Sequence, residues 1–135
     1  MTPVVLDASA ALQYLAASGA PPPTSPHALH APRLLRSEVL SALHANVWRG
    51  VVPPAAAQEM LRRLDGLAIS LFADERLLHE RAWTIADELG WAKTYDAEYV
   101  ALAQILDIPL LTVDGRLARG VEHLITIVGP AALGL

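Results

Sequence analysis

Two acidic residues stand directly after apolar runs, where a carboxylate is costly unless it is paired or bound to a cation. Asp7 follows Val4–Leu6, and Asp114 follows Leu110–Val113. Each run predicts a buried strand, so both carboxylates are expected at the carboxyl ends of strands, where open α/β sheets bind their ligands. If the two strands are adjacent and parallel, the two carboxylates lie at one edge of the sheet. For either residue alone, a helix cap or a turn is the alternative explanation.

Two further acids belong to predicted helices. Asp96 lies in the first turn of the mostly apolar helix "TYDAEYVALAQILD", after the potential N-cap Thr94. Burial of this helix would direct its N-terminus into a cleft. Glu38 lies at the margin of the apolar arc formed by Leu35, Val39, Leu40, Ala42, Leu43 and Val47. A favourable acid at a helix N-terminus and a solvated edge glutamate are the structural alternatives.

Four converging carboxylates would repel one another, and a divalent cation would relieve that repulsion. Mg²⁺ and Mn²⁺ prefer carboxylate oxygens, whereas zinc is disfavoured because the chain has no cysteine and its five histidines lack an HExxH-like spacing. The pattern therefore predicts a Mg²⁺ (or Mn²⁺) site. Asp7 and Asp96 are the first choices for direct ligands, while Asp114 and Glu38 bind through water or orient a nucleophilic water. A bound cation makes hydroxide available near neutral pH.

The elements that position these acids alternate between helices and short apolar strands. Helices are expected over residues 8–17, 32–49 (ended by Gly50), 54–64, 73–90 and 94–107, and a third strand within 124–128. Residues 19–30 predict a surface loop, with a flap over a site as the alternative; Leu67–Phe72 fits a short strand or a linker, and Gly115–Arg119 a turn or short helix. This alternation predicts an α/β fold, a three-layer α/β/α domain with a small parallel central sheet.

Length and composition narrow the class of protein. The 135 residues suit a single domain, 1–135, and the net charge of −4 argues against a general basic coat for nucleic acid. If four of the fourteen acids form a cation site, the remaining ten balance the ten Lys and Arg. No apolar stretch approaches the roughly 18 residues of a membrane span, and no basic signal-peptide region precedes Asp7. We therefore expect a cytoplasmic protein.

Four segments carry a resemblance to a known family. "VVLDASA", "LLRSEVLSAL", "TYDAEYVALA" and "LLTVDGRLA", in this order and spacing, resemble the motifs of the PIN-domain nucleases. The similarity is greatest to the small toxin ribonucleases of bacterial VapBC toxin–antitoxin pairs. It implies a PIN-like fold and a Mg²⁺- or Mn²⁺-dependent endoribonuclease that hydrolyses RNA. It also implies the toxin of a type II toxin–antitoxin pair, which inhibits growth or translation.

The resemblance also implies roles for single residues. The family's acids fall on Asp7, Glu38, Asp96 and Asp114. Its small hydroxyl residue near the first acid falls on Ser9, and Thr112 matches the one before the last acid; both are expected to hydrogen-bond carboxylates or a metal-bound water. Arg116 is a candidate for phosphate contact, with a solvated turn arginine as the alternative. The implied partners are RNA, a small VapB-like antitoxin that threads into the cleft, and a second copy in a homodimer.

Other functions stay open at this stage. One is a catalytically silent PIN-fold binding or regulatory module, and another is a PIN nuclease of RNA processing that has no antitoxin. A receiver-like acidic pocket fits poorly, because the only lysine, Lys93, precedes a helix. The Pro21–Pro26 stretch is denser in proline than the family pattern. Two helices carry apolar residues that suit either a partner groove or the core: Met60, Leu61, Leu64, Leu77, Leu78 and Trp83.

Overall fold

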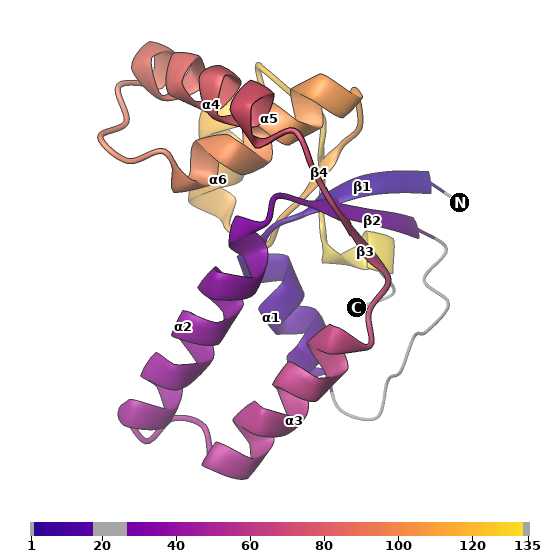
Figure 1. Ribbon diagram of the computed structural model, residues 1–135, viewed down its shortest axis with the longest axis vertical. Coiled ribbons are helices and arrows are strands. Elements are labelled where there is room, and N and C mark those ends of the chain that lie inside the picture. The colour runs from indigo at the N-terminus through magenta and orange to yellow at the C-terminus, as the bar shows by residue number, and fades with distance from the viewer. Residues whose placement is uncertain (1, 18–26, 134–135) are drawn as a thin grey trace.

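A parallel sheet forms the centre of the protein (Figure 1), as seen in a computed structural model that describes residues 2–17 and 27–133. Within these residues the sheet has five strands in the order β3-β2-β1-β4-β5, and every pairing is parallel. The strands are β1 (Thr2–Leu6), β2 (His27–Ala31), β3 (Ile69–Leu71), β4 (Leu110–Leu111) and β5 (Ile127–Val128). The first strand and the strand at Leu110 are adjacent and parallel, since Val5 pairs with Leu110, so the condition for bringing Asp7 and Asp114 to one edge of the sheet is met.

Helices cover both faces of the sheet. They are α1 (Ala8–Ala16), α2 (Leu34–Trp48), α3 (Pro54–Asp65), α4 (Glu75–Leu89), α5 (Tyr95–Leu106) and α6 (Gly115–Val121), with a 3₁₀ turn η1 (Pro130–Leu133). The chain moves from β1 to β2 to β3 in one direction, then returns to β4 and β5 in the other. Right-handed crossovers therefore place α1–α3 on one face and α4–α6 on the other (Figure 1). The predicted three-layer α/β/α fold is confirmed.

The loop prediction for residues 19–30 is wrong in its last part. His27–Ala31 forms β2, which lies between β1 and β3. Its sequence, HALHA, has no β-branched or aromatic residue and gives no local strand signal. The strand is held by parallel hydrogen bonding on both sides and by burial of Leu29 and Ala31. The Pro21–Pro26 stretch lies outside the described residues.

Smaller differences concern element ends. Leu67–Phe72, which was ambiguous, contains β3, and residues 115–121 form the helix α6. Pro32 does not open α2, because its carbonyl accepts the Leu35 amide in a turn that precedes the helix. Gly50 follows the helix end with a φ of 74°, a left-handed conformation that glycine adopts without strain.

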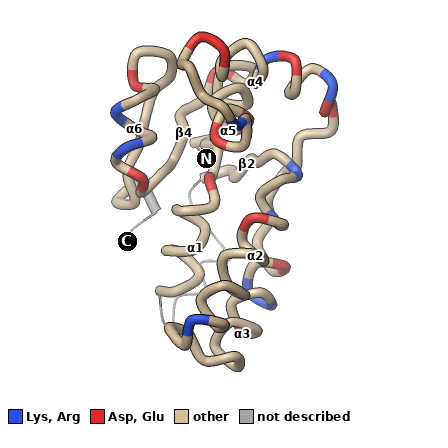
Figure 2. The backbone as a smooth tube through the Cα atoms, turned by 90° about the vertical axis from the view of Figure 1, so that its left-hand side faces the viewer, with Lys and Arg blue, Asp and Glu red and all other residues tan. Residues whose placement is uncertain are grey.

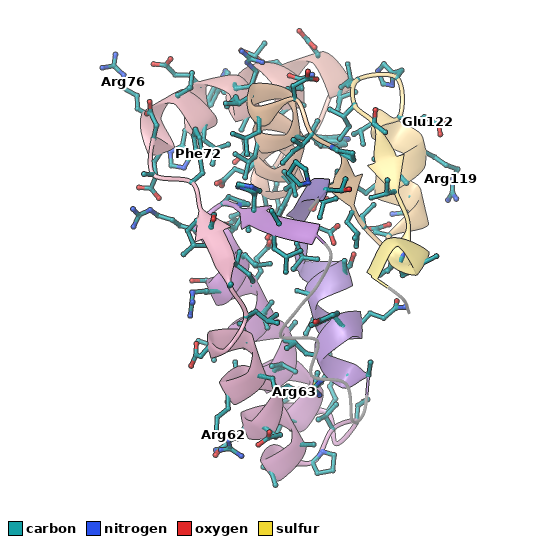
Figure 3. The ribbon with its side chains drawn as sticks, turned by 90° about the vertical axis from the view of Figure 1, so that its right-hand side faces the viewer. Arg62, Arg63, Phe72, Arg76, Arg119 and Glu122 are labelled. Atoms are coloured by element: carbon teal, nitrogen blue, oxygen red, sulfur yellow. The ribbon has the colours of Figure 1, made fainter. Side chains whose placement is uncertain are left out.

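Arg63 of α3 ties that helix to the end of α1. Its Nη1 donates to the carbonyl of Leu15 at 2.7 Å and its Nη2 to the carbonyl of Ala17 at 3.1 Å. These carbonyls end α1 and have no partner within the helix. Figure 3 shows Arg63 among the lower helices, in contrast to Arg76, which projects outward. The contact fixes α1, and thereby Asp7 at its start, against α3.

Burial separates the apolar residues that the sequence left ambiguous. Leu64 and Leu78 belong to the core, whereas Leu77 and Trp83 are exposed. The apolar arc assigned to α2 is also too wide, because Leu40 is 53% exposed while Leu43 is 2% exposed. Within the described part of the chain, no helix combines the length and apolarity needed to cross a bilayer.

The contrast between these two leucines gives a matched test of the core. We expect Leu43→Ala to lower the free energy of unfolding by about 2–5 kcal/mol, because it removes buried methyl groups and leaves a cavity. Leu40→Ala, the same change three residues earlier on the same helix, should alter it by less than about 0.5 kcal/mol. Urea unfolding followed by far-ultraviolet circular dichroism measures both. Equal losses in the two variants would contradict the described burial of α2.

Candidate active site

The topology brings four acids to the carboxyl edge of the sheet. Asp7 follows β1 and Asp114 follows β4, and these strands flank the point where the strand order reverses. Since α5 leads directly into β4, it runs against the strands, and its first turn with Asp96 lies at the same edge. The helix α2 leaves β2 at that edge and carries Glu38. In Figure 2 the starts of α1, α2, α5 and α6 surround one part of the molecule.

Asp7 and Asp114 are both helix caps. Oδ1 of Asp7 accepts from the Ala10 amide at 2.9 Å and from Ser9 Oγ at 2.7 Å. Oδ1 of Asp114 accepts from the amides of Arg116 at 3.0 Å and Leu117 at 3.2 Å. In each case the cap uses one carboxylate oxygen, so capping does not consume the other. The cap and ligand explanations for these residues are therefore compatible.

Two hydroxyls connect the strand ends. Ser9 Oγ lies 3.2 Å from Thr112 Oγ1, and it also accepts from the Val113 amide at 3.2 Å. The Asp114 amide donates to Thr112 Oγ1 at 3.0 Å. Because the single hydroxyl hydrogen of Ser9 is given to Asp7, Thr112 is the donor in its contact with Ser9. The network fixes Asp7 relative to the turn that holds Asp114.

The acids act on one another electrostatically. Asp7 is only 4% exposed, and burial raises the pKa of its carboxyl, to which the charge of Asp114 adds. Desolvation of the carboxyl also raises the pKa of Asp96, with further contributions from the charges of Asp114 and Asp7. The pKa of Glu38 is raised by burial first and then by Asp96 and Asp7. The carboxyls of Asp7, Glu38 and Asp96 therefore lie close enough to other acids of the site for those charges to raise their pKa values.

The donor set suits a hard divalent cation, because it consists of carboxylate oxygens. As the side chains stand, no three His, Asp or Glu residues in the described part of the chain are arranged around a single ion position. A cation would have to draw the carboxylates together by rotation of their side chains. The unused oxygen of each capping aspartate can accept an ion while the cap is kept, and the longer side chain of Glu38 allows the remaining movement.

Tyr99 is a site residue that the sequence interpretation missed. Its hydroxyl donates to Oε1 of Glu38 at 2.5 Å, while its ring is buried in the core. Burial raises the pKa of Tyr99, and the hydrogen bond and charge of Glu38 raise it further, so the phenol stays protonated. Tyr99 follows Asp96 by three residues on α5, a spacing that places both on one helix face. That spacing was the available signal.

Glu98 is a second missed acid. Its side chain is largely buried, and its carboxylate lies 3.6 Å from Nε2 of His79. Burial raises its pKa, His79 opposes this, and the charges of Glu38 and Glu75 raise it again. Glu98 therefore extends the acidic cluster beyond the four predicted residues. Arg116 is exposed beside Asp114, and within the described residues its guanidinium has no ion pair.

Asp7→Asn tests the electrostatic cost of the site. A raised folded-state pKa means that the folded protein binds a proton more tightly than the unfolded chain. Stability from this proton is present below the ordinary value of 3.8 and is lost as pH rises through the higher folded-state pKa. Asparagine keeps the Oδ1 acceptor of the cap. We therefore expect Asp7→Asn to raise the metal-free thermal midpoint near pH 7 and to have little effect near pH 3.

The matched control is Asp74→Asn. Asp74 also caps a helix, accepting from the Leu77 amide at 3.1 Å, but it is exposed. Its substitution should leave the midpoint unchanged at both pH values. Differential scanning calorimetry in EDTA measures all three proteins. A lower midpoint for Asp7→Asn near pH 7 would show that the ionised carboxylate stabilises the fold, contrary to this account.

Tyr99→Phe tests the support of Glu38. The substitution keeps the buried ring and removes one donor to a half-buried carboxylate, so we expect a loss of about 1.5–3 kcal/mol in the free energy of unfolding. Tyr95→Phe, on the same helix with an exposed ring, should change it by less than about 0.5 kcal/mol. Urea unfolding at neutral pH measures both. A Tyr99→Phe protein as stable as Tyr95→Phe would mean that the hydrogen bond contributes nothing.

Comparisons with solved structures agree with this architecture. PAE2754 of Pyrobaculum aerophilum superposes with a TM-score of 0.75 at 22% identity, covering 98% of this chain and 92% of that one. The structure titled VapBC2 of Rickettsia felis, bound to a promoter DNA fragment, superposes with a TM-score of 0.63 at 10% identity, covering 95% and 98%. At these identities the likeness concerns the fold. No protein-family model matches the chain.

Sequence relatives identify the family. Ribonuclease VapC9 of Mycobacterium tuberculosis is 37% identical over 116 residues, which cover 85% of this chain and 88% of the relative. Ribonuclease VapC1 of the same species is 36% identical over 123 residues, covering 87% and 90%. These relatives bear out the resemblance seen in the four sequence motifs. The chain belongs to the VapC family of PIN-domain ribonucleases.

Proposed function

We propose that the protein is a divalent-metal-dependent endoribonuclease, the toxin of a type II toxin–antitoxin pair. The observation that carries the proposal is the gathering of four carboxylates, from four different elements, beside the switch point of the sheet. The names of the relatives, VapC ribonucleases, agree with this chemistry. Such an acidic edge repels RNA unless cations neutralise it, which is why we include Mg²⁺ or Mn²⁺ in the proposal.

Asp7 and Asp96 are the proposed direct ligands, with Asp114 and Glu38 acting directly or through water. When bound, the cation lowers the pKa of water and neutralises charge that develops on the phosphate. Ser9 and Thr112 hold Asp7 in one orientation, so that its carboxylate needs little rearrangement on binding. Tyr99 bonds to Oε1 of Glu38 and leaves Oε2 to accept a proton from the attacking water. Arg116 is the proposed contact for a neighbouring phosphate.

Partners follow from the same proposal. One structural neighbour is titled a toxin–antitoxin complex from Klebsiella pneumoniae, and others are titled VapBC2 and VapBC-1. We propose a small VapB-like antitoxin that covers the acidic edge, and a homodimer as the active assembly. We propose a cytoplasmic location, because RNA is the proposed substrate.

Substitution of the acids tests the proposed chemistry. Asp96→Asn and Glu38→Gln should each lower Mg²⁺-dependent RNA cleavage at least about 100-fold, because each removes a ligand or the proton acceptor. Asp87→Asn, on the exposed side of α4, is the control and should keep full activity. EDTA should stop cleavage by the wild type, and excess Mg²⁺ or Mn²⁺ should restore it. Gel analysis of a mixed-sequence RNA pool measures all of these.

Two outcomes would overturn the proposal. Cleavage that persists in EDTA would exclude the metal-dependent mechanism. Absence of cleavage of varied RNAs by the folded wild type, with any divalent cation, would favour a catalytically silent PIN module. The thermal unfolding midpoint of each variant, measured in parallel, separates loss of chemistry from loss of fold.

A further inference from the structure

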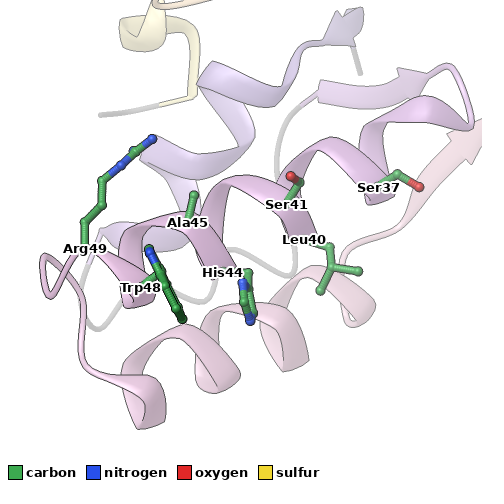
Figure 4. A pocket seen from close by; sticks show the side chains of 7 residues that line it. All are labelled: Ser37, Leu40, Ser41, His44, Ala45, Trp48 and Arg49. Carbon is green, nitrogen blue, oxygen red and sulfur yellow. The ribbon is translucent and has the colours of Figure 1, made fainter.

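The outward face of α2 carries a hollow of about 520 Å³ (Figure 4). Leu40, His44 and Trp48 line it at successive four-residue intervals, and the rings of His44 and Trp48 point to the same side of the helix. Trp48 is 84% exposed, more than any other large apolar residue of the described chain. An indole so exposed contributes nothing to the core and is available to a ligand.

This hollow is continuous with the acidic site. A second hollow of about 350 Å³ on the same helix is lined at one end by Glu38 and at the other by Arg49. The two share Ser41, Ala45 and Arg49. The path from Glu38 to Trp48 spans ten residues of helix, about 15 Å, which is the length of roughly four stacked nucleotides.

The charge at the far end of the path is available. Three other arginines on α2–α4 are held by carboxylates: Arg36 by Asp65 at 2.8 Å, Arg62 by Glu59 at 2.6 Å and Arg76 by Glu80 at 3.2 Å. Within the described residues Arg49 has no ion pair and no side-chain hydrogen bond. Arg49 lines the same hollow as Trp48, and Figure 4 shows its side chain extending away from the indole. A free guanidinium and an exposed aromatic ring along one path are the groups that bind a phosphate and stack a base of single-stranded nucleic acid.

We propose that the outward face of α2 is a track for single-stranded RNA that leads to the acidic site. Trp48 stacks one base and Arg49 contacts a phosphate, about four nucleotides from the bond to be cleaved. The inference rests on the proposed ribonuclease function and adds a subsite to it. Leu40 alone would suit a protein segment. The polar residues Ser41 and His44 interrupt the apolar stripe on this face. The two ends of the path are the acidic site at Glu38 and the free Arg49.

Binding to inactive protein tests the track without turnover. Full-length Asp96→Asn protein in Mg²⁺ is titrated with a fluorescein-labelled 12-nucleotide mixed-sequence RNA, followed by anisotropy, and with unlabelled trinucleotides as competitors. Trp48→Ala should weaken 12-nucleotide binding about 5- to 150-fold. Arg49→Gln should reduce the slope of log affinity against log salt by about 0.7. Trinucleotide binding should be unchanged in both, because a trinucleotide at the acidic site does not reach them.

Matched controls use side chains of the same type outside the track. Trp83→Ala removes another exposed indole, on α4, and Arg76→Gln removes an outward arginine of the same helix. Both should bind the 12-nucleotide RNA like the parent. If Trp48→Ala and Arg49→Gln also bind like the parent, or lose long and short RNA equally, the track is overturned.

Wild-type cleavage of the same RNA separates the two proposals. Normal cleavage with normal binding in Trp48→Ala overturns the track and leaves the ribonuclease proposal intact. Binding that depends on Trp48 without any cleavage by the wild type supports the track and overturns the ribonuclease proposal. A change in sedimentation of Trp48→Ala from dimer to monomer, with RNA affinity unchanged, assigns the face to a second copy of the chain and overturns the track.

Discussion

The parallel pairing of β1 with β4 is the constraint on which the acidic site depends. It sets the ends of two strands that are far apart in the chain beside each other. Asp7 follows the end of β1 directly, and Asp114 lies three residues after the end of β4. The helices α1, α2 and α6, each of which follows a strand, begin at this edge of the sheet. The helix α5, which leads into β4, begins there too. Four helix N-termini therefore converge on one region, and their positive dipole ends partly offset the negative charge of the carboxylates.

This arrangement gives single side chains two tasks. Asp7 caps α1 and lies in the core, so the fold both needs its acceptor oxygen and bears the cost of its charge. Hydrogen bonds from Ser9 Oγ and the Ala10 amide to the carboxylate moderate that cost. Tyr99 does the same for Glu38. Its hydroxyl, on the buried side of α5, donates a hydrogen bond to this half-buried carboxylate. The site is thus built from groups that the fold already holds rigidly, while its charge remains unbalanced without a cation.

The parts of this picture that the sequence revealed are local patterns. An apolar run followed at once by an acid indicated the strand ends at Asp7 and Asp114, and apolar character over α5 indicated a buried helix. The Tyr99–Glu38 contact joins residues 61 positions apart and has no local pattern beyond the spacing from Asp96. The strand β2 lacked β-branched residues and was misread as loop. The exposure of Leu40 depends on where α3 packs against α2. A helical wheel of α2 alone holds no information on that packing.

The hydroxyl contact between Ser9 and Thr112 joins residues 103 positions apart. During translation Asp7 leaves the ribosome early, while β4 and Asp114 are among the last parts to follow. A nascent chain consequently carries its first acid without the partners that orient it until β4 and Thr112 have followed. The edge assembles only then, and a truncation before β4 yields a fragment that lacks both Thr112 and Asp114.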